Sequence, residues 1–164
     1  MNTEYHYILM SQQDLLQNEV IEEIVRERTN SYMLQNKKND FWIVISPKFI
    51  ENSNLTEKLK QTNFYRQRIC STNSTNKKDF YGAIVSFNKE FITWLSLRLG
   101  YFENLETFQT VLVANKNYVS NGAYGKFSIV NQDNSPFFSN PRLIHPTILT
   151  NKYRTLLDSF YKIN

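Results

Sequence analysis

The six-residue run from Phe41 to Ser46, FWIVIS, most strongly constrains the fold of this chain. Aromatic and β-branched side chains occupy nearly every position, which is typical of a strand that is buried on both faces. Because such a strand needs cover on both sides, we expect a sheet packed against helices. The chain has 164 residues, 41% of them hydrophobic, so it can bury this core without disulfides.

Two further segments have the composition of strands, namely Tyr5–Met10 and Gly82–Phe87. Apolar residues at helical spacing predict helices over Asp14–Arg28, Leu55–Gln61 and from Asn88, as the cap, to about residue 102. This alternation of strands and helices favours a parallel sheet, although split arrangements with antiparallel pairing have the same element order.

The polar segments 29–39 and 62–80 are predicted to be loops, and the character of the chain changes after residue 102. The later segments are predicted as a strand (Thr110–Val119), a type I′ turn (Asn121-Gly122), a strand (Ala123–Val130), a loop (Asn131–Pro146) and a helix (Thr147–Tyr161). We therefore expect a core domain over residues 1–107, with a polar insertion at about 62–80, and a C-terminal extension over 108–164 made of a hairpin and a helix.

Few side chains are suited to catalysis. The chain has one cysteine, Cys70, and two histidines, His6 and His145, and none of them has a partner at metal-ligand or catalytic spacing. Glycine motifs that cradle phosphate are missing. No apolar stretch reaches the roughly 20 residues of a membrane span, and no targeting segment is visible. We predict no catalytic residues, metal or cofactor, and a protein that binds a partner.

The last helix of the predicted core is apolar around most of its circumference. At ~100° per residue, Arg98 falls in the middle of the apolar arc. Trp94 and Tyr101 flank it on one side, and Phe91 and Phe102 on the other. Burying this charge without a partner would cost several kcal/mol, so Arg98 needs either an ion pair or an exit to water.

Two interpretations of Arg98 remain open. It forms an internal ion pair with Asp40 or a glutamate, or it anchors an exposed aromatic patch with the composition of an interface hot spot. Asp40, Phe41 and Trp42, where a loop meets a strand, could complete that patch. For Trp42 and Trp94, packing in the core is the alternative to partner binding.

Four segments carry a resemblance to a known family: YHYILMSQQDLL, EEIVRERTNSY, NDFWIVISPKFI and AIVSFNKEFITWLSLRL. They cover roughly residues 4–103, apart from the polar insertion. The motifs DFW-x-V-x-x-P-x-F and VS-x-N-x-x-FI-x-WL-x-LRL are specific in order and spacing. On these residues the chain resembles the plastid and cyanobacterial family called hypothetical chloroplast open reading frame fifty-four.

The resemblance implies an accessory or assembly factor of the oxygen-dependent cyclase of chlorophyll synthesis. That cyclase converts Mg-protoporphyrin IX monomethyl ester to protochlorophyllide, and its chemistry belongs to a catalytic di-iron subunit. The resemblance implies that this chain is no enzyme and binds that subunit. It also implies a plastid location, in the stroma or peripherally on the thylakoid membrane through the partner.

The resemblance further implies an α+β fold of the PsbP-like type, with an antiparallel sheet packed with helices, in place of the parallel sheet. The interaction surface of the family includes positions that match Asp40, Phe41 and Arg98. With Trp42 and Trp94, these form our predicted partner-binding set.

Two other functions are alternatives to this hypothesis. A tetrapyrrole-binding carrier of the same pathway, or an enzyme, would need an apolar pocket with an axial ligand or base, for which only His6 and His145 are available. A nucleic-acid-binding module would need clustered basic residues, but the net charge of +4 is dispersed along the chain.

Overall fold

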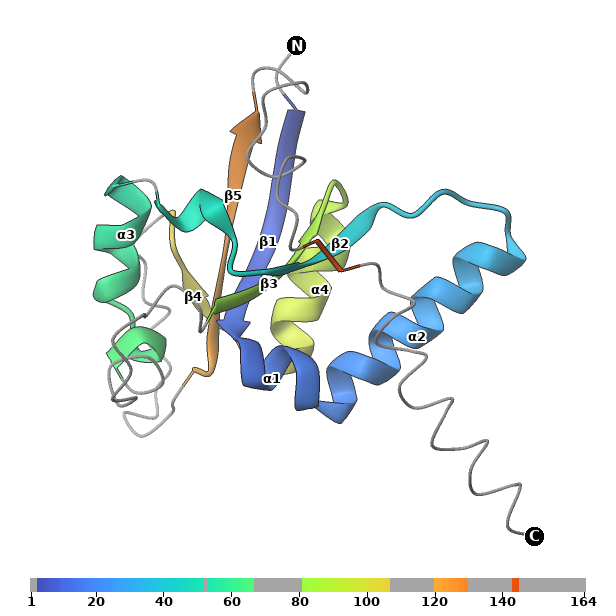
Figure 1. The fold of residues 1–164 in the computed structure, drawn as a ribbon, viewed down its shortest axis with the longest axis horizontal. Coiled ribbons are helices and arrows are strands. Elements are labelled where there is room, and N and C mark those ends of the chain that lie inside the picture. The colour runs from blue at the N-terminus through green and yellow to red at the C-terminus, as the bar shows by residue number, and fades with distance from the viewer. Residues whose placement is uncertain (1–2, 52, 67–80, 107–119, 130–142, 145–164) are drawn as a thin grey trace, which may run out of the picture.

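The computed structural model describes residues 3–51, 53–66, 81–106, 120–129 and 143–144 (Figure 1). Several predictions therefore lie outside the described residues. They are the strand over Thr110–Val119, the first half of the type I′ hairpin, the helix over Thr147–Tyr161, the surroundings of Cys70 and His145, and most of the loops over 62–80 and 131–146.

Six strands form one sheet in the order β4-β5-β1-β3-β2-β6. Their bounds are β1 (Thr3–Ser11), β2 (Phe41–Ile45), β3 (Tyr81–Ser86), β4 (Glu103–Asn104), β5 (Gly122–Ile129) and β6 (Leu143–Ile144). All neighbouring strands pair in antiparallel fashion except β4 and β5, which are parallel. The antiparallel α+β fold class is confirmed, and the PsbP-like label stays a prediction.

The parallel sheet expected from the alternation of elements is wrong for a specific reason. Strands β1 and β2 do run in the same direction, because each is antiparallel to β3. However, β3 lies between them in the sheet. The helical connection thus joins two strands that are not neighbours, which is the split arrangement that element order alone cannot distinguish.

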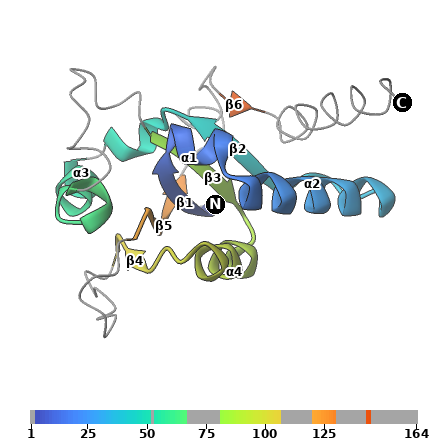
Figure 2. The ribbon, with the colours of Figure 1, turned by 90° about the horizontal axis from the view of Figure 1, so that it is seen from below.

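The helices cover both faces of the sheet (Figures 1 and 2). They are α1 (Gln12–Gln17), α2 (Glu19–Leu34), α3 (Ser53–Lys60) and α4 (Lys89–Leu99), together with the 3-10 helix η1 (Lys48–Glu51). Residues of α1, α2 and α4 share one hydrophobic core with the sheet. Residues of η1 and α3 share a second core with the opposite face.

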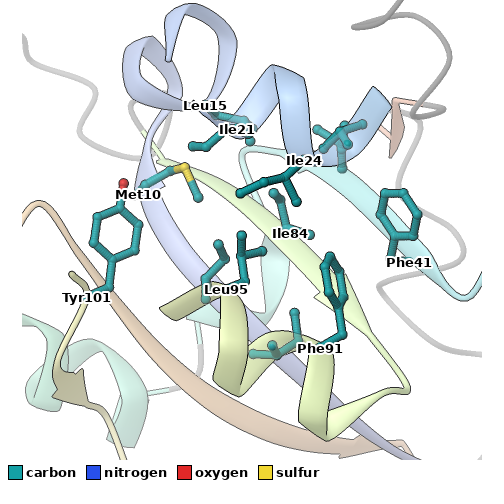
Figure 3. Packing of buried hydrophobic residues seen from close by; sticks show 13 residues of the cluster. Met10, Leu15, Ile21, Ile24, Phe41, Ile84, Phe91, Leu95 and Tyr101 are labelled. Atoms are coloured by element: carbon teal, nitrogen blue, oxygen red, sulfur yellow. The ribbon is translucent and has the colours of Figure 1, made fainter. Parts of the chain in front are cut away.

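The side chains of β1 alternate between these two cores, as expected for a strand with cover on both sides. Ile8 faces the core of α1, α2 and α4, where the register aligns it with Ile84 of β3 and Ile43 of β2. Tyr7 and Leu9 face the core of η1 and α3. Figure 3 shows the first core, with Ile24 of α2 and Phe91 of α4 both directed toward Ile84.

The single helix predicted over Asp14–Arg28 is two helices. The chain is extended at Asn18, whose side-chain Oδ1 accepts the backbone N–H of Val20 at 2.9 Å and so caps α2. An asparagine side chain competes with the helical backbone in this way. At the other end, α2 continues to Leu34, through a segment that the sequence predicts to be a loop.

Helix α4 begins as predicted and ends earlier than predicted. Asn88 Oδ1 accepts the backbone N–H of Phe91 at 3.0 Å, which confirms the cap. The helix ends at Leu99 because Gly100 has φ 73°, a left-handed conformation that suits glycine. The backbone N–H of Tyr101 then bonds the carbonyl of Ser96 at 2.8 Å and closes the helix end.

Two strands come from the part of the chain assigned to the C-terminal extension. Strand β5 confirms the strand expected from Ala123, and it pairs with β1 from Gly122 opposite Met10 to Ile129 opposite Thr3. Strand β6 lies within the predicted loop over Asn131–Pro146, so that prediction is wrong at residues 143–144, which pair with β2. The division at residue 107 stays a prediction.

Gly122 lies where β5 passes close to β1 and to the chain after α4. A Cβ atom at this position would stand 2.6 Å from the carbonyl oxygen of Leu9 and 2.6 Å from Cδ2 of Tyr101. We expect Gly122→Ala to lower the free energy of unfolding by about 1–3 kcal/mol, because a backbone oxygen must shift. Urea denaturation measures this. Ser128→Ala, at an exposed position of the same strand, is the matched control and should leave the midpoint unchanged.

His6 provides a pH dependence of stability. Burial lowers the pKa of its imidazole below the usual range, against an opposing effect from Glu4, whose Oε1 lies 3.2 Å from Nε2. The neutral form is therefore favoured in the folded state, and stability is lost as the pH falls below about 6.5, the pKa of the unfolded state, and through the lower pKa of the folded state. Urea denaturation at several pH values between 8 and 5 should show a smaller loss of unfolding free energy for His6→Gln than for the wild type. An unchanged slope would contradict this assignment.

Candidate functional site

The outer side of α4 carries an exposed stripe, which we call the α4 stripe and define as Thr93, Trp94, Leu97 and Arg98. The Trp94 residue is 50% exposed and Leu97 62% exposed, although both are large and apolar. They lie at i and i+3 on the helix, with Arg98 at i+4, so the three side chains are neighbours on one face. The inner side of α4 is buried through Phe91, Ile92, Leu95 and Ser96.

Arg98 reaches water and does not form the internal ion pair. Its side chain is exposed, and within the described residues it has no hydrogen bond or ion pair. The carboxylate of Asp40, its suggested partner, lies instead against Arg28 of α2. Arg98 thus lies exposed beside Trp94 and Leu97, and its role in binding a partner stays a prediction.

Asp40 joins α2 to the start of β2. One carboxylate oxygen, Oδ2, accepts a hydrogen bond from the Tyr32 hydroxyl at 2.9 Å and lies 3.5 Å from Nη2 of Arg28. Its backbone carbonyl accepts bonds from the Ser86 hydroxyl at 2.9 Å and from the Phe87 N–H at 3.3 Å. Burial first, and then the bond to Asp40, raise the pKa of the Tyr32 phenol.

Arg28 is surrounded by aromatic rings. Its Cζ atom lies 3.7 Å from the ring centroid of Phe91, 4.9 Å from that of Tyr32 and 5.9 Å from that of Phe41. A guanidinium in this position gains cation–π attraction while the carboxylate of Asp40 balances its charge. We call this cluster the Arg28 corner: Arg28, Tyr32, Asp40, Phe41 and Phe91.

Sequence reasoning missed Arg28, because it was assigned to the end of an amphipathic helix. One local signal was available. Arg28 and Tyr32 stand four residues apart, the spacing at which two side chains on a helix meet. That signal required the helix to extend past Arg28, and the contact with Phe91 comes only from tertiary packing.

A groove of about 270 Å³ lies between α2 and the first half of α4. Phe91 and Trp94 of α4 line this groove together with Arg28 of the Arg28 corner. The full lining is Ile24, Glu27, Arg28, Ser31, Tyr32, Phe91 and Trp94. The groove therefore connects the Arg28 corner to the α4 stripe.

The structure does not bring all five predicted site residues into one environment. Asp40 lies at the Arg28 corner and Trp94 lines the groove. Arg98 follows Trp94 by about one turn of α4. Phe41 is fully buried in the core, with its ring centroid 5.6 Å from that of Phe91.

Trp42 points to the other face of the sheet, as the alternation along β2 requires. Its ring lies 5.1 Å from that of Phe87 and 6.3 Å from that of Tyr5, measured between centroids. It packs against the core of η1 and α3. The structure therefore does not bring Trp42 together with the α4 stripe.

Two further searches cover only the described part of the chain. Within it, no three side chains of histidine, cysteine, aspartate or glutamate gather closely enough to hold a metal ion. None of the helices in these ranges is long and apolar enough to span a bilayer.

The fold and site define a small α+β protein with an antiparallel sheet between helices and a partly apolar, arginine-bearing outer helix. Residues 3–110 match the model of the family described as "Ycf54 protein". The chain belongs to the Ycf54 family.

Curated relatives come from red algae and a cyanobacterium. An uncharacterized protein ycf54 from Porphyra purpurea is 38% identical over 99 residues, which are 60% of this chain and 78% of the relative. A Ycf54-like protein from Synechocystis is 39% identical over 97 residues, which are 59% of this chain and 62% of the relative.

Solved structures of other proteins are similar to this chain in fold. The Ycf54 protein from Synechocystis superposes with a TM-score of 0.54 at 28% identity, covering 84% of this chain and 96% of the other. The All0216 protein from Nostoc gives 0.52 at 30% identity, covering 87% of this chain and 95% of the other.

The Arg28 corner can be tested against a matched control on the same helix. Lysine keeps the charge but cannot stack a planar group on Phe91, so we expect Arg28→Lys to lower the free energy of unfolding by about 1–2 kcal/mol. Arg26→Lys keeps a positive charge beside Glu22 at a side chain that is 45% exposed, and should change the free energy of unfolding by less than ~0.5 kcal/mol. Equal urea midpoints for the two variants would contradict a structural role for the corner.

Proposed function

We propose that this chain is a non-catalytic accessory or assembly factor that binds the catalytic di-iron subunit of the Mg-protoporphyrin IX monomethyl ester cyclase. In this role it supports formation of protochlorophyllide in chlorophyll synthesis. Membership of the Ycf54 family and relatives from red algae and a cyanobacterium support a setting of this kind. The proposed location is the plastid, in the stroma or peripherally on the thylakoid membrane through the partner.

The observation that carries the proposal is the α4 stripe. Monomeric proteins cover most large apolar side chains, yet Trp94 and Leu97 are at least half exposed beside a charged Arg98. Tryptophan and arginine are the residues most enriched in interface hot spots, and their truncation costs the most affinity. A partner that covers the stripe would bury both apolar side chains and pair the charge.

The Arg28 corner has a supporting role in this proposal. Asp40 has 28% of its side chain accessible, so it can contact a partner at the Arg28 corner. Phe41 is buried and acts by holding Phe91, and therefore α4, in place. Trp42 stays a predicted partner-binding residue, on a surface separate from the stripe.

Affinity capture from solubilised thylakoid membranes tests this function. Tagged wild-type chain should retain the di-iron subunit of the cyclase. Arg98→Ala should weaken retention by roughly 30-fold, which corresponds to loss of a hot-spot side chain worth about 2 kcal/mol. Lys89→Ala removes the same charge from an exposed position at the start of α4 and should bind as the wild type does.

The outcomes separate function from site. If the wild-type chain does not retain the di-iron subunit, the proposed function is wrong. If Arg98→Ala retains as much as the wild type, the function stands and the assignment of Arg98 is wrong. Circular dichroism of each variant verifies that the fold is intact, which we expect because Arg98 contacts no other described residue through a hydrogen bond or ion pair.

A further inference from the structure

The two rims of the groove between α2 and α4 carry opposite charges. On α2, Glu23 and Glu27 are exposed and lie four residues apart, and Glu27 lines the groove. On α4, Arg98 is exposed about one turn beyond Trp94, which also lines it. Within the described residues none of these three charges forms an ion pair.

Neighbouring charges on the same helix are paired. Arg26 bonds Glu22 at 3.0 Å, and Arg28 lies against Asp40. Glu27 at the groove and Arg98 on the outer side of α4 are left without an ion pair within the described residues. A partner that pairs both must present a positive charge toward Glu27 and a negative charge toward Arg98.

The spacing of the exposed residues fits a helix as the occupant. Trp94, Leu97 and Arg98 stand at i, i+3 and i+4, the positions that a helix lying along α4 contacts. The other common mode, addition of a strand, needs a long free sheet edge. The α4 stripe lies on a helix and presents no sheet edge.

We propose that the groove takes an amphipathic helix of the partner, with apolar side chains against Trp94 and Leu97, a basic side chain facing Glu27 and an acidic side chain facing Arg98. This inference rests on the proposed function and adds the chemistry of the bound segment. Opposite charges on the two rims fix the direction in which the helix lies, because a reversed helix places like charges together.

Photo-crosslinking locates the bound segment. A benzophenone amino acid replaces Leu97 in the full chain, which is mixed with the purified di-iron subunit and irradiated. We expect the crosslinked peptide to come from a helix of that subunit, with an acidic and a basic residue on opposite flanks of an apolar stripe. The same probe at Glu57, exposed on α3 across the sheet, is the control and should give no crosslink to that segment.

A charge exchange then tests the pairing. Arg98→Glu should weaken binding at least tenfold, and replacing the acidic residue of the crosslinked helix by lysine should restore most of that loss. Glu27→Lys should also weaken binding about tenfold, and Glu57→Lys should leave it unchanged.

These results distinguish the two proposals. If the wild-type chain binds the di-iron subunit but the crosslinked segment is not a helix with both charges, the inference is overturned and the proposed function stands. If lysine at the acidic position of the crosslinked helix does not restore binding of Arg98→Glu, that acidic residue does not face Arg98. If the wild-type chain gives neither binding nor a crosslink, the proposed function itself is wrong.

Discussion

The contact of the Arg28 guanidinium with the Phe91 ring, 3.7 Å from the centroid, joins α2 to α4, and the candidate site depends on it. The charge of Arg28 would be costly in the core, but Asp40 lies beside it and three rings surround it. Because Asp40 also accepts hydrogen bonds from Ser86 and Phe87 at the end of β3, the same residue ties α2 to the sheet. The outer side of α4 is thereby held at a defined angle to α2.

The arrangement of charges explains why Arg28 is half-buried and Arg98 is exposed. Arg28 lies against three rings and the Asp40 carboxylate, which offset part of the cost of its desolvation, although its Nε atom has no hydrogen-bond partner. Arg98 meets neither within the described residues, and its side chain stays in water beside Trp94 and Leu97. An exposed arginine next to two large apolar side chains is the composition that a binding surface needs. In the proposed function, this exposed part of α4 contacts the partner.

Much of the local structure was predictable. The strands of the core, the cap at Asn88 and the helix over α3 follow from side-chain periodicity and capping chemistry, which act over a few residues. The break at Asn18 and the end of α4 at Gly100 were missed, although both depend on local residues. The extension of α2 to Leu34 was missed for a different reason, because Tyr32 is held there by Asp40 across the corner.

Patterns along the chain are enough to predict strands buried on both faces, the place of Arg98 among large apolar residues on one helix, and the family motifs. Contacts in the fold set which carboxylate pairs with which arginine, place Phe41 in one core and Trp42 against the other, and put β3 between β1 and β2. The reason is physical. Periodicity shows which faces of an element are apolar, but the choice of partner depends on contacts between residues that are distant along the chain.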